Sequence, residues 1–336
     1  MSLLFQYVLQ EIQESKKELE ISFQDWTEDE VQLILLHLKT SPNQIKSLCF
    51  GNLPHYAVQP LGNVLLENYL QKLYLSGNHI GDSGAKVIGD MLQVNSSLQV
   101  IDLNSNLISD IGVLSLSHAL RRPNCNIIEF LLAVNRVSDQ GARSLAESLL
   151  ENQSLISLNL GVNEIGDIGA TFLGTALLSN RTLKELYLSG NLIGDHGASS
   201  LASSFETNAS VRVIFDLGFN RIQNHGAKSF ANTIKQYHGL EILYLDQNQI
   251  EEDGGEALLE SIKVNVSLKD LKLEDNLFSL ELEKKFNKIL NLRRSVEVLN
   301  ILSLCSIRTI PRLGNGSFIR ILPIELMKRL ALFLIL

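Results

Sequence analysis

The residues that could do chemistry in this chain are its histidines, its cysteines and a set of regularly spaced acidic residues. The three cysteines, Cys49, Cys125 and Cys305, are far apart and odd in number, so they predict neither a disulfide framework nor a zinc site. The chain has no nucleophile-elbow, zinc-protease, C-x-x-C or phosphate-loop pattern. The histidines fall at mostly unrelated positions: His37, His55, His79, His118, His196, His225 and His238. We therefore expect no enzyme activity, no metal site and no cofactor.

The acidic residues belong to a regular series that could suggest a calcium or acid–base row. A polar residue able to cap a helix recurs at seven positions: Asp82, Asp110, Asp139, Asp167, Asp195, Asn224 and Glu252. Side-chain oxygens of these types accept hydrogen bonds from the unpaired N–H groups at a helix start, so we expect these residues to be helix caps. A glycine stands two positions later, as in Gly84 and Gly112, which predicts close approach of helix to strand or to the neighbouring coil.

The elements that position these residues come from an internal repeat. The phrase LYLSGNHIGDSGA at residues 73–85 returns as LYLSGNLIGDHGA at residues 186–198. Leucine or another apolar residue stands eight, five and three positions before nearly every central asparagine, and the L-x-L portion predicts a short strand with alternating faces. The central asparagine recurs every 28 or 29 residues, at Asn78, Asn106, Asn135, Asn163, Asn191, Asn220, Asn248 and Asn276.

The register continues beyond these eight copies. Counting back gives degenerate copies at Leu53 and Gln24, and counting forward gives one at Leu304, preceded by Val296, Leu299 and Ile301. The total is about eleven repeats. We expect a capping helix at residues 1–17, a solenoid at residues 18–304 and a C-terminal cap at residues 305–336. The first helix should cover the first coil with Leu4, Val8 and Ile12, with Tyr7 beside them.

The repeat L-x-x-L-x-L-x-x-N, with the motif N-x-I-G-D-x-G-A, resembles the ribonuclease-inhibitor-like class of leucine-rich repeats. That class includes the ribonuclease inhibitor, the sensor regions of NOD-like receptors and the Ran GTPase activators, and similar freestanding proteins occur among bacterial effectors. The resemblance implies an α/β leucine-rich repeat solenoid, a horseshoe with a parallel sheet on the concave face and helices on the convex face. It also implies that the eight asparagines form a buried structural ladder between coils. It fixes architecture rather than function.

The concave face is where we expect a partner to bind. The residues between and after the strand leucines should face solvent there, and three of the seven tyrosines share one such slot. Tyrosines among carboxylates predict a protein partner with a basic surface. The candidate partner-binding residues are Tyr74, Asp102, Asn104, Asn159, Tyr187, Asp216, Tyr244, Asp246, Lys272 and Glu274.

Charge and hydropathy limit the classes of partner and the cellular locations that we expect. A net charge of −8 and a pI near 5.5 argue against nucleic acid, which requires a basic surface. The first residues lack the basic segment and apolar core of a secretory signal, and the apolar C-terminal end is too short and too charged to span a membrane. We expect a soluble, cytoplasmic protein, or one acting in host cytosol if it is an effector.

The C-terminal segment LPIELMKRLALFL, residues 322–334, supports a second interpretation. It is similar to the opening helix of an F-box at Leu322, Pro323, Glu325, Leu326, Leu330 and Leu334. This similarity would make the chain a substrate adaptor that docks a ubiquitin-ligase adaptor protein. The alternative is a helix that caps the last coil, with Pro323 in its first turn. A third possibility, from the resemblance to Ran activators, is a GTPase activator.

Overall fold

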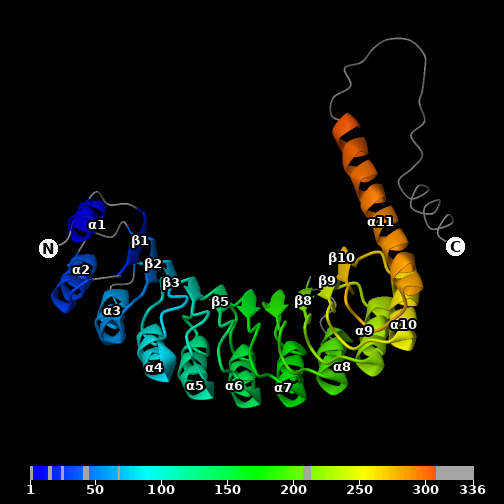
Figure 1. Cartoon of the computed structure of the whole chain (residues 1–336), viewed down its shortest axis with the longest axis horizontal. Coiled ribbons are helices and arrows are strands. Elements are labelled where there is room, and N and C mark those ends of the chain that lie inside the picture. Colours follow the sequence, from blue (N-terminus) through cyan, green and yellow to red (C-terminus); the bar gives the residue numbers. More distant parts are fainter. Residues whose placement is uncertain are drawn as a thin grey trace, which may run out of the picture.

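The protein is a curved arc with strands on its inner side and helices on its outer side (Figure 1). The computed structural model describes residues 3–13, 17–23, 26–40, 45–66, 69–206 and 213–307. The strands are β1 (Glu18–Ser22), β2 (Ser47–Gly51), β3 (Lys72–Tyr74), β4 (Val100–Asp102), β5 (Glu129–Leu131), β6 (Ser157–Asn159), β7 (Glu185–Tyr187), β8 (Val213–Asp216), β9 (Leu240–Tyr244) and β10 (Asp270–Lys272). They pair in chain order and in parallel, so the predicted α/β leucine-rich repeat solenoid is confirmed.

Helices form the outer layer of the arc, apart from the first and the last helix, which lie at its two ends (Figure 1). The helices are α1 (Leu3–Gln13), α2 (Glu28–Thr40), α3 (Val58–Leu65), α4 (Gly81–Leu92), α5 (Asp110–Leu120), α6 (Asp139–Leu149), α7 (Asp167–Leu177), α8 (Asp195–Ser203), α9 (Asn224–Gln236), α10 (Glu252–Val264) and α11 (Leu280–Ile307). Short 3-10 helices occupy His55–Ala57 and Ser204–Glu206. An apolar residue of each strand points toward these helices; Leu73, Leu158 and Leu243, for example, are fully buried. Because strand side chains alternate, the residues on either side of it face the inner side.

The repeated asparagines bond each coil to the coil before it. Asn106 accepts hydrogen bonds from the backbone N–H groups of Asn78 (3.0 Å) and Ile80 (3.2 Å) and donates to the carbonyl of Leu75 (2.8 Å). Asn191 makes the equivalent bonds to the N–H of Ile165 and the carbonyl of Leu160. These side chains satisfy buried backbone groups that have no partner within their own coil, which is why the repeat position needs an amide that both donates and accepts.

The acidic residues also form hydrogen bonds between coils, but each one bonds the coil that follows it rather than the coil before it. Asp110 Oδ1 accepts hydrogen bonds from the N–H groups of Ser138 (2.8 Å) and Gly141 (2.9 Å), which belong to the start of the following helix, α6. These residues therefore accept hydrogen bonds at a helix start, as expected, and the helix that they cap is that of the following coil. A residue at the first helical position has its side chain directed along the solenoid, where the next helix presents unpaired N–H groups. The same pattern holds for Asp82, Asp139, Asp167, Asp195 and Asn224.

The first coil is covered by α1. Phe5, Val8 and Ile12 are at most 3% exposed, and the rings of Phe5 and Trp26 meet edge to face with centroids 5.8 Å apart. Tyr7, expected beside these residues, is 56% exposed. Phe5, which was not among the residues predicted to cover the coil, lies there as well. The covering helix keeps the apolar end of the sheet from water.

The other end of the arc differs from the prediction. Residues 280–307 form a single helix, so Val296, Leu299, Ile301 and Leu304 do not build an eleventh strand, and the described residues contain ten strands. The apolar spacing at 296–304 fits a helix as well as a strand, and no glycine or proline interrupts residues 280–307. The first turns of α11 cover the last coil through Leu282, Phe286 and Ile289, which are at most 4% exposed.

Candidate protein-binding face

The inner surface consists of three parallel rows of side chains that the strand register aligns. The middle row runs from Cys49 to Lys272 through one residue of every strand between them. A second row lies two residues earlier in each strand, and a third lies two residues later, directly after the strand. Neighbouring strands are about 4.8 Å apart. A partner lying along the arc therefore meets a new side chain from each row at that interval.

All ten predicted partner-binding residues lie in the middle and third rows, and each is half-buried or exposed. They fall into two groups. One group, on or just after β3 and β4, is Tyr74, Asp102 and Asn104. The other group, on or just after β7 to β10, is Tyr187, Asp216, Tyr244, Asp246, Lys272 and Glu274. Asn159 lies between the groups. Tyr74 is four strands, about 19 Å, from Tyr187, so the three tyrosines do not form one cluster.

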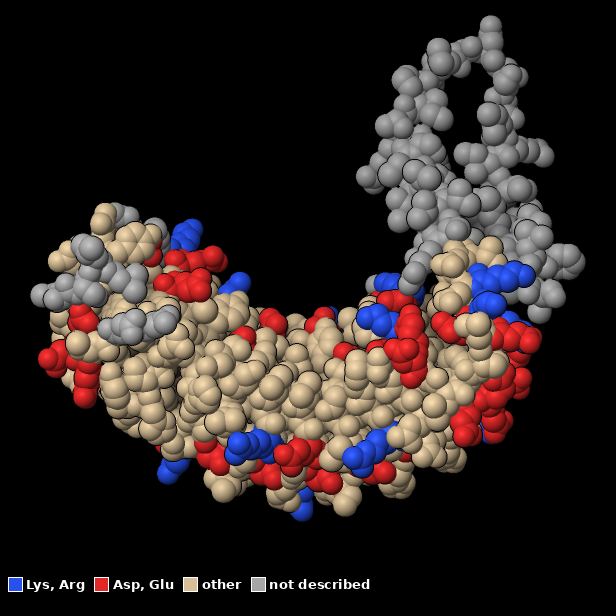
Figure 2. Space-filling model, viewed as in Figure 1, with Lys and Arg blue, Asp and Glu red and all other residues tan. Residues whose placement is uncertain are grey.

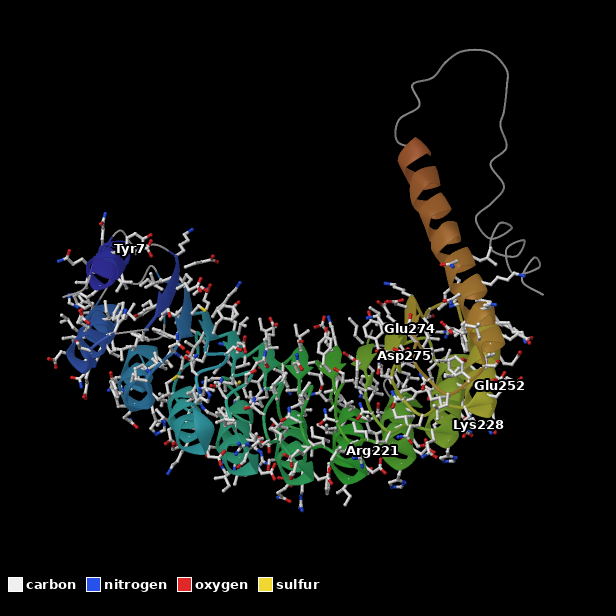
Figure 3. All side chains as sticks on the ribbon, viewed as in Figure 1. Tyr7, Arg221, Lys228, Glu252, Glu274 and Asp275 are labelled. Carbon is white, nitrogen blue, oxygen red and sulfur yellow. The ribbon has the colours of Figure 1, made fainter. Side chains whose placement is uncertain are left out.

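The C-terminal group is a connected aromatic and acidic surface. Tyr187 donates its hydroxyl to Glu185 Oε2 at 3.3 Å, and Tyr244 donates its hydroxyl to Asp270 Oδ2 at 3.2 Å. The Lys272 ammonium lies 3.8 Å from the centre of the Tyr244 ring, a cation–π contact. Figure 2 shows acidic side chains with a few basic ones at the inner surface of this end, and Figure 3 places Glu274 and Asp275 there.

Burial and neighbouring carboxylates shift the pKa values of this surface. Burial, followed by the charges of Glu185 and Asp216, raises the pKa of Tyr187 to about 12. Burial and the charge of Asp270 likewise raise the pKa of Tyr244. Burial raises the pKa of Asp246, and the nearby charge of Asp216 raises it further. The group thus carries more negative charge than its own cation neutralises.

Several further predicted residues also use part of their side chain within the protein. Asp102, Asn159 and Asp216 each accept a hydrogen bond from the backbone N–H two residues later, at 2.9 to 3.1 Å. Asn104 accepts one from the N–H of Ala133 at 2.6 Å. These side chains are held in fixed orientations, and each keeps a polar atom for a partner.

The second row, two residues before the middle row, was not among the predicted partner-binding residues. Glu185 and Asp270 lie one residue before a strand leucine, and they hold the hydroxyls of the two C-terminal tyrosines. The sequence contains the pattern that predicts this row. Side chains alternate along a strand, so in L-x-x-L-x-L the residue before the middle leucine faces the same side as the residue after it. Lys72 and Glu129 occupy the same row.

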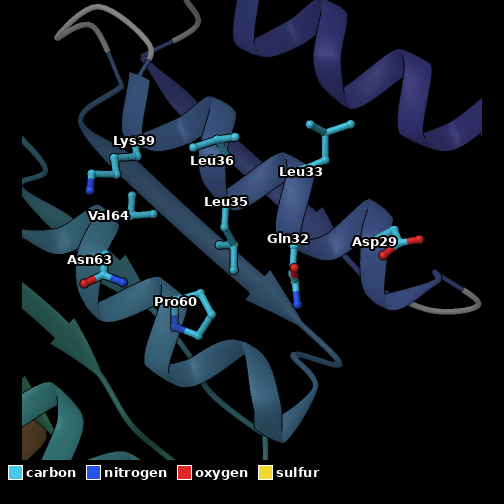
Figure 4. A pocket seen from close by; sticks show the side chains of 9 residues that line it. All are labelled: Asp29, Gln32, Leu33, Leu35, Leu36, Lys39, Pro60, Asn63 and Val64. Carbon is cyan, nitrogen blue, oxygen red and sulfur yellow. The ribbon is translucent and has the colours of Figure 1, made fainter.

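Residues of metal-ligating types, and hollows between helices, also lie outside the concave face. Within the described residues no group of three or more histidine, cysteine, aspartate or glutamate side chains could hold a metal ion. A groove of about 720 Å³ lies between α2 and α3 (Figure 4), and its lining has one carboxylate, Asp29, and one lysine, Lys39, among amides and aliphatic groups. A second hollow, of about 260 Å³ between α8 and α9, is lined mainly by hydroxyl and amide side chains. Nor does any helix of the described chain have the length and apolarity needed to cross a bilayer.

Comparisons with known proteins agree with this architecture. The leucine-rich repeat family model matches residues 68–89, 94–117, 151–174 and 179–202. A segment of 113 residues, 33% of this chain, is 31% identical to 11% of the NACHT, LRR and PYD domains-containing protein 14 of Mus musculus. A segment of 139 residues, 40% of this chain, is 34% identical to 30% of the ribonuclease inhibitor of Mus musculus.

A third relative is named as a regulator of an enzyme. A segment of 87 residues, 25% of this chain, is 34% identical to 9% of the protein phosphatase 1 regulatory subunit 37 homolog of Caenorhabditis elegans. The chain therefore matches between 9% and 30% of the length of these three relatives.

Proposed function

We propose that this chain, a leucine-rich repeat protein of the ribonuclease-inhibitor-like type, is a recognition scaffold that binds a protein partner along its concave sheet. The observation that carries the proposal is the aromatic and acidic surface of β7 to β10, where Tyr187 and Tyr244 are oriented by Glu185 and Asp270. Ring orientation fixed before binding lowers the entropy that a partner would otherwise cost. Tyrosine also offers a large contact area with a polar tip.

The partner should present a basic surface. Five carboxylates lie in the three rows of β7 to β10, and Lys272 is the cation that contacts a ring among them: Glu185, Asp216, Asp246, Asp270 and Glu274. Positive charge on a partner would compensate this excess and accelerate association. Two of the relatives are named for action on another protein, a ribonuclease and a phosphatase, which supports a binding role.

The adaptor interpretation has no observation to favour it. Residues 322–334, and the predicted C-terminal cap from residue 308 onward, lie outside the described residues. No described residue marks GTPase-activating chemistry either. We therefore propose neither role.

The test is affinity capture from eukaryotic cytosol with matched tyrosine variants. One bait carries Tyr187→Ala and Tyr244→Ala; the control carries Tyr7→Ala and Tyr56→Ala, which remove two exposed tyrosines outside the sheet. Circular dichroism first establishes that both variants are folded. Captured proteins are identified by mass spectrometry, and each is purified and titrated against the three forms. We expect a partner that is lost only in the sheet variant. Partners that all bind the sheet variant as well as the intact chain would refute the proposal.

A further inference from the structure

A second set of side chains borders the concave face. The residue directly before each ladder asparagine has a positive φ, between 52° and 72°, in eight successive coils. We call this set the rim row: Gly77, Ser105, Val134, Val162, Gly190, Phe219, Gln247 and Asp275. Each follows directly after a residue of the third row, so the rim row continues the concave surface toward one side of the arc.

Three members of the rim row are unexpected in type. Val134, Val162 and Phe219 are apolar side chains that are 49%, 54% and 57% exposed, so about half of the surface of each is in water. A positive φ favours glycine or asparagine and is a true outlier for a β-branched residue. Other coils place glycine, serine, glutamine or aspartate at this position. The three apolar residues thus combine an unfavourable backbone with incomplete burial, a combination that suggests a role at the surface.

Two carboxylates meet the rim row at Phe219. Asp216 Oδ1 accepts a hydrogen bond from Gly218 N at 3.1 Å, and a Cβ added at Gly218 would lie 3.0 Å from Asp246 Oδ1. The Asp246 carboxylate therefore lies over the glycine that precedes Phe219. Neither Asp216 nor Asp246 forms an ion pair with another described residue. A negative surface that the Lys272 charge compensates only in part lies directly beside an exposed apolar one.

Beside the rim row, the third row carries small residues in the four coils from Val134 to Phe219: Ala133, Gly161, Ser189 and Gly218. Val162 and Phe219 are two coils apart, about 10 Å. That separation is close to the rise of about 10.5 Å between residues i and i+7 of a helix. Val134 and Val162 are one coil apart, close to one helical turn.

We infer that a basic amphipathic helical segment of the partner docks along the rim of β5 to β9. Its apolar side chains contact Val134, Val162 and Phe219, and its arginine or lysine side chains reach Asp216 and Asp246. Charge complementarity selects this occupant, and the rim continues the concave face to which we assign partner binding. The inference rests on the proposed function and specifies the partner's contact segment.

The experiment is a selection of random 16-residue peptides displayed on phage against the full chain, followed by dissociation constants from fluorescence polarisation. One variant carries Val162→Asn and Phe219→Asn, because asparagine accepts a positive φ and removes the apolar contact. Its control is Ser105→Asn, which places the same residue in the same row. A second variant carries Asp216→Asn and Asp246→Asn; its control, Asp29→Asn with Asp90→Asn, makes the same charge change on the outer helices α2 and α4.

We expect enriched peptides with basic residues on one helical face and apolar residues on the adjacent face. Each double variant should weaken their binding by about tenfold or more, whereas the controls leave it unchanged. Added salt should weaken binding to the intact chain. Enriched peptides that are acidic or uncharged, basic peptides indifferent to both double variants, or no enrichment would each overturn the inference.

These outcomes are separable from failure of the proposed function. Peptides that lose binding in the Tyr187→Ala, Tyr244→Ala variant but not in the rim variant would refute the rim inference and leave concave recognition standing. Cytosolic partners that all survive the tyrosine variant would refute concave recognition itself.

Discussion

The carboxylate of Asp110 occupies the space beside Gly141 in the following coil. Asp110 Oδ1 accepts a hydrogen bond from Gly141 N at 2.9 Å, and a Cβ added at residue 141 would lie 2.5 Å from that oxygen. The repeated aspartate and the repeated glycine are thus two parts of one contact between coils. A side chain at the glycine would displace the group that caps the helix.

Gly141→Ala should therefore destabilise the protein. The new methyl would also lie 2.7 Å from Val137 Cγ1, so neither neighbour can give way without losing its own packing. We expect a loss of about 2–4 kcal/mol, from overpacking and from disruption of a charge-assisted hydrogen bond. Urea denaturation followed by circular dichroism measures it. Gly51→Ala is the control, since its nearest contact is 3.5 Å away, and it should change stability by less than about 1 kcal/mol. Equal losses in the two variants would contradict this account.

Asn106→Ala should break the connection between two coils. Asn106 is fully buried, and its removal leaves the N–H groups of Asn78 and Ile80 and the carbonyl of Leu75 without this partner. Buried unpaired groups cost about 1–3 kcal/mol each, so we expect a loss of at least about 2 kcal/mol, measured as the unfolding free energy in urea. Asn126→Ala, at an exposed asparagine with one hydrogen bond to Ser96, is the control and should have little effect. A near-neutral Asn106→Ala would mean that water replaces the amide.

The sequence predicts the strands and the inner surface well because both depend on periodicity. Leucines at fixed spacing must turn to one side of a strand, so the same spacing assigns Tyr187 and Tyr244 to the other side. The glycine of each repeat could likewise be read as a site of close approach.

Contacts between coils and the ends of the solenoid were less predictable. Capping chemistry identifies Asp110 as a hydrogen-bond acceptor, but not which helix supplies the donor, because that depends on how coils stack. Val296 and Leu299 fit a helical and a strand pattern equally over so short a span, and the chain's continuous helix-forming residues decide for the helix. The rim row was missed because a positive φ at Val162 leaves no sign in the residue type.

Tyr187 should titrate about two pH units above an ordinary tyrosine. Its pKa is raised to about 12, so the folded protein holds the proton more tightly than the unfolded chain. The stability that this group contributes is present below pH 10 and is lost as the pH rises to about 12. Absorbance near 295 nm, compared with that of Tyr187→Phe, isolates its titration.

Glu185→Gln provides the check on the cause of this shift. Burial is the largest cause and the Glu185 charge the next, so the substitution should lower the pKa of Tyr187 without restoring it to 10. A return to 10 would show that charge, rather than burial, dominates. An unchanged value would show that the carboxylate has no effect.

Val162→Asn should leave the fold at least as stable as before. A side chain with positive φ costs about 1–2 kcal/mol, and this one has a φ of 52°. Val162 is 54% exposed, so it retains less than half of the roughly 1.5–3 kcal/mol that full burial of an aliphatic side chain provides. The two effects cancel to within about 1 kcal/mol, and asparagine tolerates the backbone better. Thermal melting of Val162→Asn beside the fully buried Val113→Asn measures the difference, because the second substitution places an amide in the core and should destabilise the protein strongly. A large loss in Val162→Asn would mean that the rim valine serves the fold, leaving no stability argument for a role in binding.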